Sequence, residues 1–76
     1  MNPVEVFKTN VCDRADAESI IGQLSLQQPE SQINFDLEDC DHILRVESRS
    51  GEIDVRSVIE LLNKNHFICE LLNLKL

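Results

Sequence analysis

The side chains in this sequence best suited to chemistry are thiols and imidazoles, and they are few. The chain holds three cysteines and two histidines among 76 residues. Thiolate and imidazole are the ligands that Cu(I) and Zn(II) favour. Cys12 with His42, His66 or both offers such a set, although no CxxC pair is present. A metal site therefore depends on whether the fold brings these separate residues together.

The cysteines also have plainer interpretations. Cys12 could be an ordinary residue at a helix entrance, with both histidines as ordinary loop residues. A redox or nucleophilic thiol is a further alternative, because a helix start lowers a thiol pKa, but Asp13 and Asp16 would repel a thiolate. Cys69 falls in an alternating pattern with Phe67 and Leu71 and is better interpreted as a small buried hydrophobe. The odd, widely spaced set excludes a full disulfide framework and favours reduced thiols.

An acidic segment near the middle of the chain is the other candidate for ion binding. It contains Asp36, Glu38, Asp39 and Asp41. Its spacing lacks the central glycine and the distant glutamate of a calcium loop. The alternatives are a solvated turn or a docking patch for a basic partner. Neither a glycine-rich phosphate loop nor the spacing of a catalytic triad is present, so we expect no enzyme and no catalytic residues.

Composition narrows the class of protein. The net charge of −7 would repel a phosphate backbone, so nucleic acid is not an expected partner. Apolar residues make up 42% of the chain and charged residues 28%, and charges interrupt every apolar run, which argues against a membrane partner. The first residues lack the basic and apolar stretches of a secretory signal. We expect one soluble domain, over residues 1–76, in the cytoplasm.

Residue types and periodicity predict a strand followed by a helix in the first part of the chain. Residues 4–9 are rich in β-branched and aromatic side chains, which favours a strand whose facing the pattern leaves open. Asp13 is placed to cap the helix, and Pro29 ends it. The helix carries an apolar stripe of Ala17, Ile20, Ile21 and Leu24.

Two alternating segments then predict a β-hairpin. The apolar positions are Ile33, Phe35 and Leu37 in one strand and Leu44 and Val46 in the other. With Asp39 and Cys40 as the turn, Leu37 faces His42, Phe35 faces Leu44 and Ile33 faces Val46. This register places every apolar pair on one face of the sheet, while Asn34 lies opposite Arg45 on the other.

A second helix and a last strand complete the pattern. Asp54 can cap this helix, with Ile53 and Val58 as a hydrophobic staple across its start. Its apolar stripe is Val55, Val58, Ile59 and Leu62. Residues 63–65 close the helix with a cation and with asparagines that tolerate left-handed backbone. Residues 67–71 alternate as a strand, and the tail to Leu76 either extends it or packs against another copy.

This order of elements predicts an α+β ferredoxin-like βαββαβ sandwich, a four-stranded antiparallel sheet with two helices on one face. In that topology the first strand lies in the middle of the sheet. Three connections then meet at one edge, and they carry Cys12, His42 and His66. The two histidines would bracket the thiol from both sides.

The loop around Cys12 resembles that of the heavy-metal-associated domains, the family of copper chaperones and of the N-terminal modules of metal-transporting ATPases. It reads Lys8-Thr9-Asn10-Val11-Cys12-Asp13-Arg14-Ala15-Asp16-Ala17. The family carries Met-x-Cys-x-x-Cys there; Asn10 stands at the methionine, Cys12 matches the first cysteine, and Ala15 replaces the second. Residues 61–67 look like the family's helix end and final strand. Residues 33–45 look like those of small uncharacterised bacterial proteins related to the family.

The resemblance implies a non-enzymatic metal-binding or metal-handling module with a copper or zinc ion as its ligand. Cys12 would be the principal thiolate, and His66, His42 or Cys40 would complete a weak site, within one molecule or between two copies. The alternative is an interaction or regulatory module that kept the scaffold and lost the ion. Such a module would use the acidic hairpin and the apolar tail for a protein partner or a homodimer.

Overall fold

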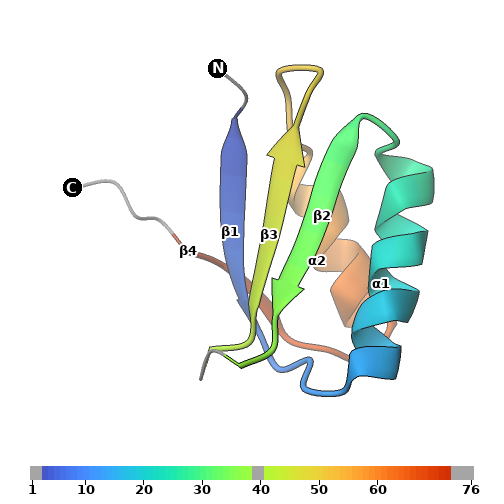
Figure 1. Cartoon of the computed structure of the whole chain (residues 1–76), viewed down its shortest axis with the longest axis vertical. Coiled ribbons are helices and arrows are strands. Elements are labelled where there is room, and N and C mark those ends of the chain that lie inside the picture. The colour runs from blue at the N-terminus through green and yellow to red at the C-terminus, as the bar shows by residue number, and fades with distance from the viewer. Residues whose placement is uncertain (1–2, 39–40, 73–76) are drawn as a thin grey trace.

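The predicted alternation of strands and helices is present in the computed structural model, which describes residues 3–38 and 41–72 (Figure 1). The elements are β1 (Val4–Thr9), α1 (Arg14–Gln27), β2 (Ser31–Asp36), β3 (Ile43–Ser48), α2 (Val55–Lys64) and β4 (Cys69–Leu72). The strands form one antiparallel sheet in the order β2-β3-β1-β4. The predicted α+β ferredoxin-like fold is confirmed. Within the described residues, neither helix has the length and apolar character needed to cross a bilayer.

Each helix begins at the aspartate that the sequence predicts. The Asp13 carboxylate accepts a hydrogen bond from the Ala15 N–H at 2.7 Å. The Asp54 carboxylate accepts from the Ser57 hydroxyl at 2.7 Å and from the Ser57 N–H at 3.1 Å. These two bonds hold the pKa of Asp54 below its ordinary value, and the bond from the hydroxyl has the larger effect. The two backbone bonds, from the Ala15 and Ser57 N–H groups, satisfy donors that the first turn of each helix leaves without helical partners.

The end of α2 differs from the prediction, because a histidine and not an asparagine takes the left-handed conformation. Asn65 has φ of −91°, whereas His66 has φ of 71°. The His66 N–H donates to the Asn63 carbonyl at 3.0 Å, and the Phe67 N–H donates to the Leu62 carbonyl at 2.9 Å. These are the two bonds of a Schellman motif, which closes a helix through a left-handed residue.

The hairpin has the predicted register over its described part. Ile33 pairs with Val46, and Phe35 pairs with Leu44. Asn34 and Arg45 pair on the opposite face, also as predicted. β2 ends at Asp36, so the predicted pair of Leu37 and His42 lies beyond the ladder. The predicted turn residues Asp39 and Cys40 lie outside the described residues.

One apolar core joins the inner face of the sheet to both helices. Its buried members are Phe7, Val11, Ala17, Ile20, Leu24, Ile33, Leu44, Val46, Val58, Leu61 and Leu62. The predicted stripes are therefore confirmed in their buried members, while Ile21, Val55 and Ile59 pack at the margin. Phe7 and Thr9 are buried, so these two residues of β1 face the core. Because side chains alternate along a strand, Val4, Val6 and Lys8 lie on the outer face of the sheet.

The last strand begins later than predicted, at Cys69 and not at Phe67. The physical reason lies in the backbone N–H groups that precede it. The Phe67 N–H closes α2, and the Ile68 N–H donates to the Asn10 side chain at 2.8 Å. Neither group is then free for the ladder with β1. The predicted tail to Leu76 lies outside the described residues after Leu72.

Candidate functional site

Three connections meet at one end of the sheet, as the topology predicts, at the bottom of Figure 1. They join β1 to α1 (residues 10–13), β2 to β3 (residues 37–42) and α2 to β4 (residues 65–68). Thr9 links the first two: its N–H donates to the Asp41 carbonyl at 3.2 Å, and its hydroxyl donates to the His42 carbonyl at 2.6 Å. The Asn10 carboxamide oxygen accepts from the Ile68 N–H and links the third. We call this edge the thiol rim.

Cys12 lies on the first of these connections with an exposed, free thiol. The residues on either side of it are held in place. Val11 is fully buried, and its N–H donates to the Thr9 hydroxyl at 3.2 Å. Asp13 caps α1. The thiol is therefore presented to solvent by a loop that is anchored immediately before and after it.

The two histidines share an unusual backbone conformation. His42 has φ of 45° and His66 has φ of 71°, and no other non-glycine residue in the described part of the chain has a positive φ. This region is sparsely populated by side-chain-bearing residues, with histidine among the more tolerant types. His66 is exposed and His42 is half-buried. The His42 Nδ1 atom is buried and has no hydrogen-bond partner among the described residues.

The rim brings the connections together without forming a finished metal centre. Within residues 3–38 and 41–72, no three His, Cys, Asp or Glu side chains are grouped so that they could hold a metal ion. Cys12, His42 and His66 thus share an edge but do not make a three-ligand set. The fourth predicted ligand, Cys40, lies outside the described residues. The donors on this edge are one thiol and two imidazoles, which are ligand types that suit a soft ion. Ala15 occupies the position in α1 where a second thiol would stand.

Cys69 behaves as the sequence predicts. Its side chain is half-buried and packs against the core from β4. Burial raises the pKa of this thiol to about 12, because desolvation disfavours the thiolate. A thiol that stays protonated is a poor metal ligand. Cys69 is a packing residue and not a site residue.

Within its described residues, the acidic hairpin shows local hydrogen bonding and no group of side chains that could hold a cation. The Asp36 carboxylate accepts a hydrogen bond from the Glu38 N–H at 3.2 Å. The Lys8 ammonium lies 3.7 Å from the Asp41 carboxylate, and both side chains are about half exposed. Such an exposed pair contributes little to stability. The described part of the hairpin matches the interpretation of a solvated turn, and Asp39 lies outside it.

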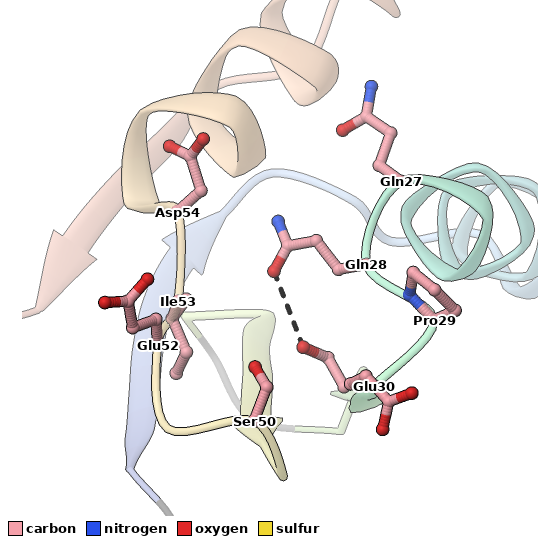
Figure 2. A pocket seen from close by; sticks show the side chains of 9 residues that line it. Gln27, Gln28, Pro29, Glu30, Ser50, Glu52, Ile53 and Asp54 are labelled. Atoms are coloured by element: carbon pink, nitrogen blue, oxygen red, sulfur yellow. Dashed lines mark hydrogen bonds between the residues drawn. The ribbon is translucent and has the colours of Figure 1, made fainter.

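A hollow at the opposite end of the molecule has no counterpart in the sequence predictions. It has a volume of about 630 Å³ and lies between the end of α1 and the start of α2 (Figure 2). Glu30, Glu52 and Asp54 line it, and the Gln28 amide points into it. Ser31 donates to the Gln28 Oε1 atom at 3.5 Å, while the Gln28 Nε2 atom is buried without a partner among the described residues. These residues come from two separate polar loops, so no sequence motif marks them.

Comparison with known proteins adds no relative. No protein-family model matches the chain, no curated protein matches it, and no solved structure matches it. The fold and the site therefore define the class by themselves. The protein is a small α+β domain of ferredoxin-like topology. Among the residues that the structure describes, Cys12 is the exposed thiol, and it lies at one end of the sheet.

Proposed function

We propose that this protein is a non-enzymatic module, related to the heavy-metal-associated domains, that binds a soft metal ion weakly at the thiol rim. The observation that carries the proposal is the joining of the three connections through Thr9 and Asn10. Those hydrogen bonds put both histidine-bearing connections beside the connection that exposes Cys12. Cu(I), and with lower preference Zn(II), is the ion whose ligand chemistry fits thiolate and imidazole.

In this proposal Cys12 is the principal ligand, because it is the exposed thiol of the described chain. His66, His42 or Cys40 supplies the second donor. A site with so few ligands leaves coordination positions for a donor from another molecule, such as a second copy or a partner thiol. That property suits an ion that is handed on rather than stored. A reduced Cys12 also requires a reducing compartment, and we propose the cytoplasm.

The backbone of His42 supports the proposal independently. Left-handed conformations of non-glycine residues concentrate at functional sites, where the surrounding structure holds them. His66 takes this conformation to close α2, whereas His42, on the other connection that flanks Cys12, ends no helix. The unpartnered Nδ1 atom of His42 is a further polar group that a ligand would satisfy.

The proposal is tested by titrating the reduced protein with Cu(I), and separately with Zn(II), against a competing chelator. We expect Cys12→Ala to weaken Cu(I) binding by about tenfold or more, since loss of one good ligand is worth at least ~1.4 kcal/mol. Cys69→Ala is the matched control, because it removes a thiol that packs in the core. We expect it to leave the affinity unchanged.

His42→Ala, His66→Ala and Cys40→Ala then identify the second donor. We expect one of these variants to weaken binding and the others to have little effect. Equal affinities in the wild type and in Cys12→Ala would contradict the proposal. Equal losses in Cys12→Ala and Cys69→Ala would contradict it as well, because they would indicate an effect on folding rather than on ligation.

A second candidate function is an interaction module, and one observation favours it. The helices cover only one face of the sheet, so side chains of all four strands lie on an open face. On that face Val4 is 42% exposed. A protein partner or a second copy would bind without any metal ion.

A further inference from the structure

The open side of the sheet, which we call the outer face, is formed by alternate residues of all four strands. Inner residues such as Phe7, Leu44 and Ile33 are buried in the core, so their neighbours in each strand turn outward. The outward residues are Gln32, Asn34 and Asp36 of β2, Ile43, Arg45 and Glu47 of β3, Val4, Val6 and Lys8 of β1, and Glu70 and Leu72 of β4.

Apolar side chains gather at the middle of this face. Val6 pairs with Leu72 on one side and with Arg45 on the other. Val6, Leu72 and Ile43 line a hollow of about 440 Å³, which Arg45 also borders. An uncovered apolar hollow ringed by polar residues is the usual character of an interaction surface on a small protein.

The charge of the outer face differs from that of the rest of the molecule. It carries Lys8 and Arg45 against Asp36, Glu47 and Glu70, two positive charges against three negative ones. The face thus accounts for −1 of the total of −7. The remaining surface carries the other −6. The small net charge of the outer face therefore opposes the approach of a second copy only weakly.

We propose that the outer face is a weak dimer interface that takes a second copy of this chain. A two-fold interface brings the same surface of each copy together, so that surface must complement itself. The outer face meets this condition, because Lys8 and Arg45 lie on the two central strands and carboxylates lie around them. Each copy can place its carboxylates against the cations of the other, with the Val6 and Leu72 side chains between them.

The size of the face sets the expected strength. The three six-residue strands are about 20 Å long and the four-residue β4 is about 13 Å long, so at a spacing of about 4.8 Å they present roughly 350 Å² per copy. Two such surfaces bury roughly 700 Å² in total, which is less than a stable specific interface needs and is in the range of weak, transient complexes. The chain has its own core without the partner, so we expect a monomer in dilute solution and a dimer in concentrated solution.

The test is sedimentation velocity of the reduced protein over a wide concentration range with a metal chelator present. The chelator and reductant exclude dimers bridged by an ion or by a Cys12 disulfide. We expect the mass to rise from 8.7 kDa toward twice that value. Arg45→Glu should raise the dissociation constant by about tenfold or more, since it sets like charges together at the centre of the interface. Val6→Thr, which keeps the shape of a β-branched side chain, should weaken the dimer without charge change.

Arg56→Glu is the matched control, because it makes the same change in net charge on the exposed surface of α2. It should leave the dissociation constant within about twofold of that of the wild type at moderate salt. A constant monomer mass at every concentration would overturn the inference. So would a dimer that neither Arg45→Glu nor Val6→Thr weakens, or one that Arg56→Glu weakens equally. The inference deepens the second candidate function and does not depend on the metal, so its failure leaves the Cys12 titration to be decided separately.

Discussion

Cys12 and Cys69 show how one residue type acquires two roles from its surroundings. Cys12 is exposed beside the start of α1, whereas Cys69 packs against the core with a pKa of about 12. Residue pattern predicted the second role, because alternation with Phe67 placed Cys69 on the inner face. It left the first role open, since a single cysteine at a loop has no neighbours in sequence that define its function.

The contrast predicts very different rates of alkylation in the folded protein. At about pH 8, we expect Cys12 to react with iodoacetamide ~100-fold or more faster than Cys69, because the thiolate is the reacting form and burial suppresses it at Cys69. Peptide mass mapping after timed quenching measures both rates in one sample. In denaturant the two rates should converge. Similar rates in the folded state would contradict the burial of Cys69.

The same raised pKa has a consequence for stability at high pH. Unfolding returns the Cys69 thiol to an ordinary pKa near 9, so above that pH the unfolded state loses a proton that the folded state keeps. This contribution therefore destabilises the folded state as the pH rises from about 9 toward 12.

At the scale of elements, the sequence predicted the helix starts and the strand register better than the end of α2. Asp13 and Asp54 act as caps because their side chains reach donors within the first turn, which is a local effect. The end of α2 depends on which residue after Asn65 can close two backbone hydrogen bonds, and that residue is His66. The late start of β4 follows from the same closure.

The left-handed conformation of His66 predicts that glycine is better there for stability. His66→Gly should stabilise the protein by about 0.5–1 kcal/mol, because glycine adopts positive φ without the steric penalty of a Cβ atom. Chemical denaturation of the wild type, His66→Gly and His66→Ala measures the difference. His66→Ala keeps the Cβ atom and should not be stabilising. If glycine gave no gain over alanine, the left-handed assignment would be wrong.

At the scale of the whole molecule, the thiol rim depends on contacts between residues far apart in the sequence. Thr9 and His42 are 33 residues apart, and Asn10 and Ile68 are 58 residues apart. Strand order was enough to predict that the connections meet, because alternation and helix periodicity define the topology. It was not enough to predict side-chain distances, so the absence of a three-ligand group within the described residues could not have been foreseen.

The two hollows were also beyond sequence analysis. The hollow near Gln28 is made by two polar loops with no shared motif, and the hollow on the outer face depends on the cross-strand neighbours of Val6. Alternation indicated that one face would be solvated. It did not show that apolar side chains would gather in the middle of that face.

The central claim is that Cys12 binds a soft ion together with a second donor, which is His42, His66 or Cys40. Heteronuclear NMR of the reduced, isotope-labelled protein during addition of Cu(I) tests it most directly, because it reads each thiol and each imidazole separately. The account predicts that the Cβ signal of Cys12 shifts up to one equivalent together with the ring signals of His42 or His66 or with the Cβ signal of Cys40, while Cys69 keeps its position. Shifts that leave Cys12 unchanged, or that move Cys12 without any of these three residues, would contradict it.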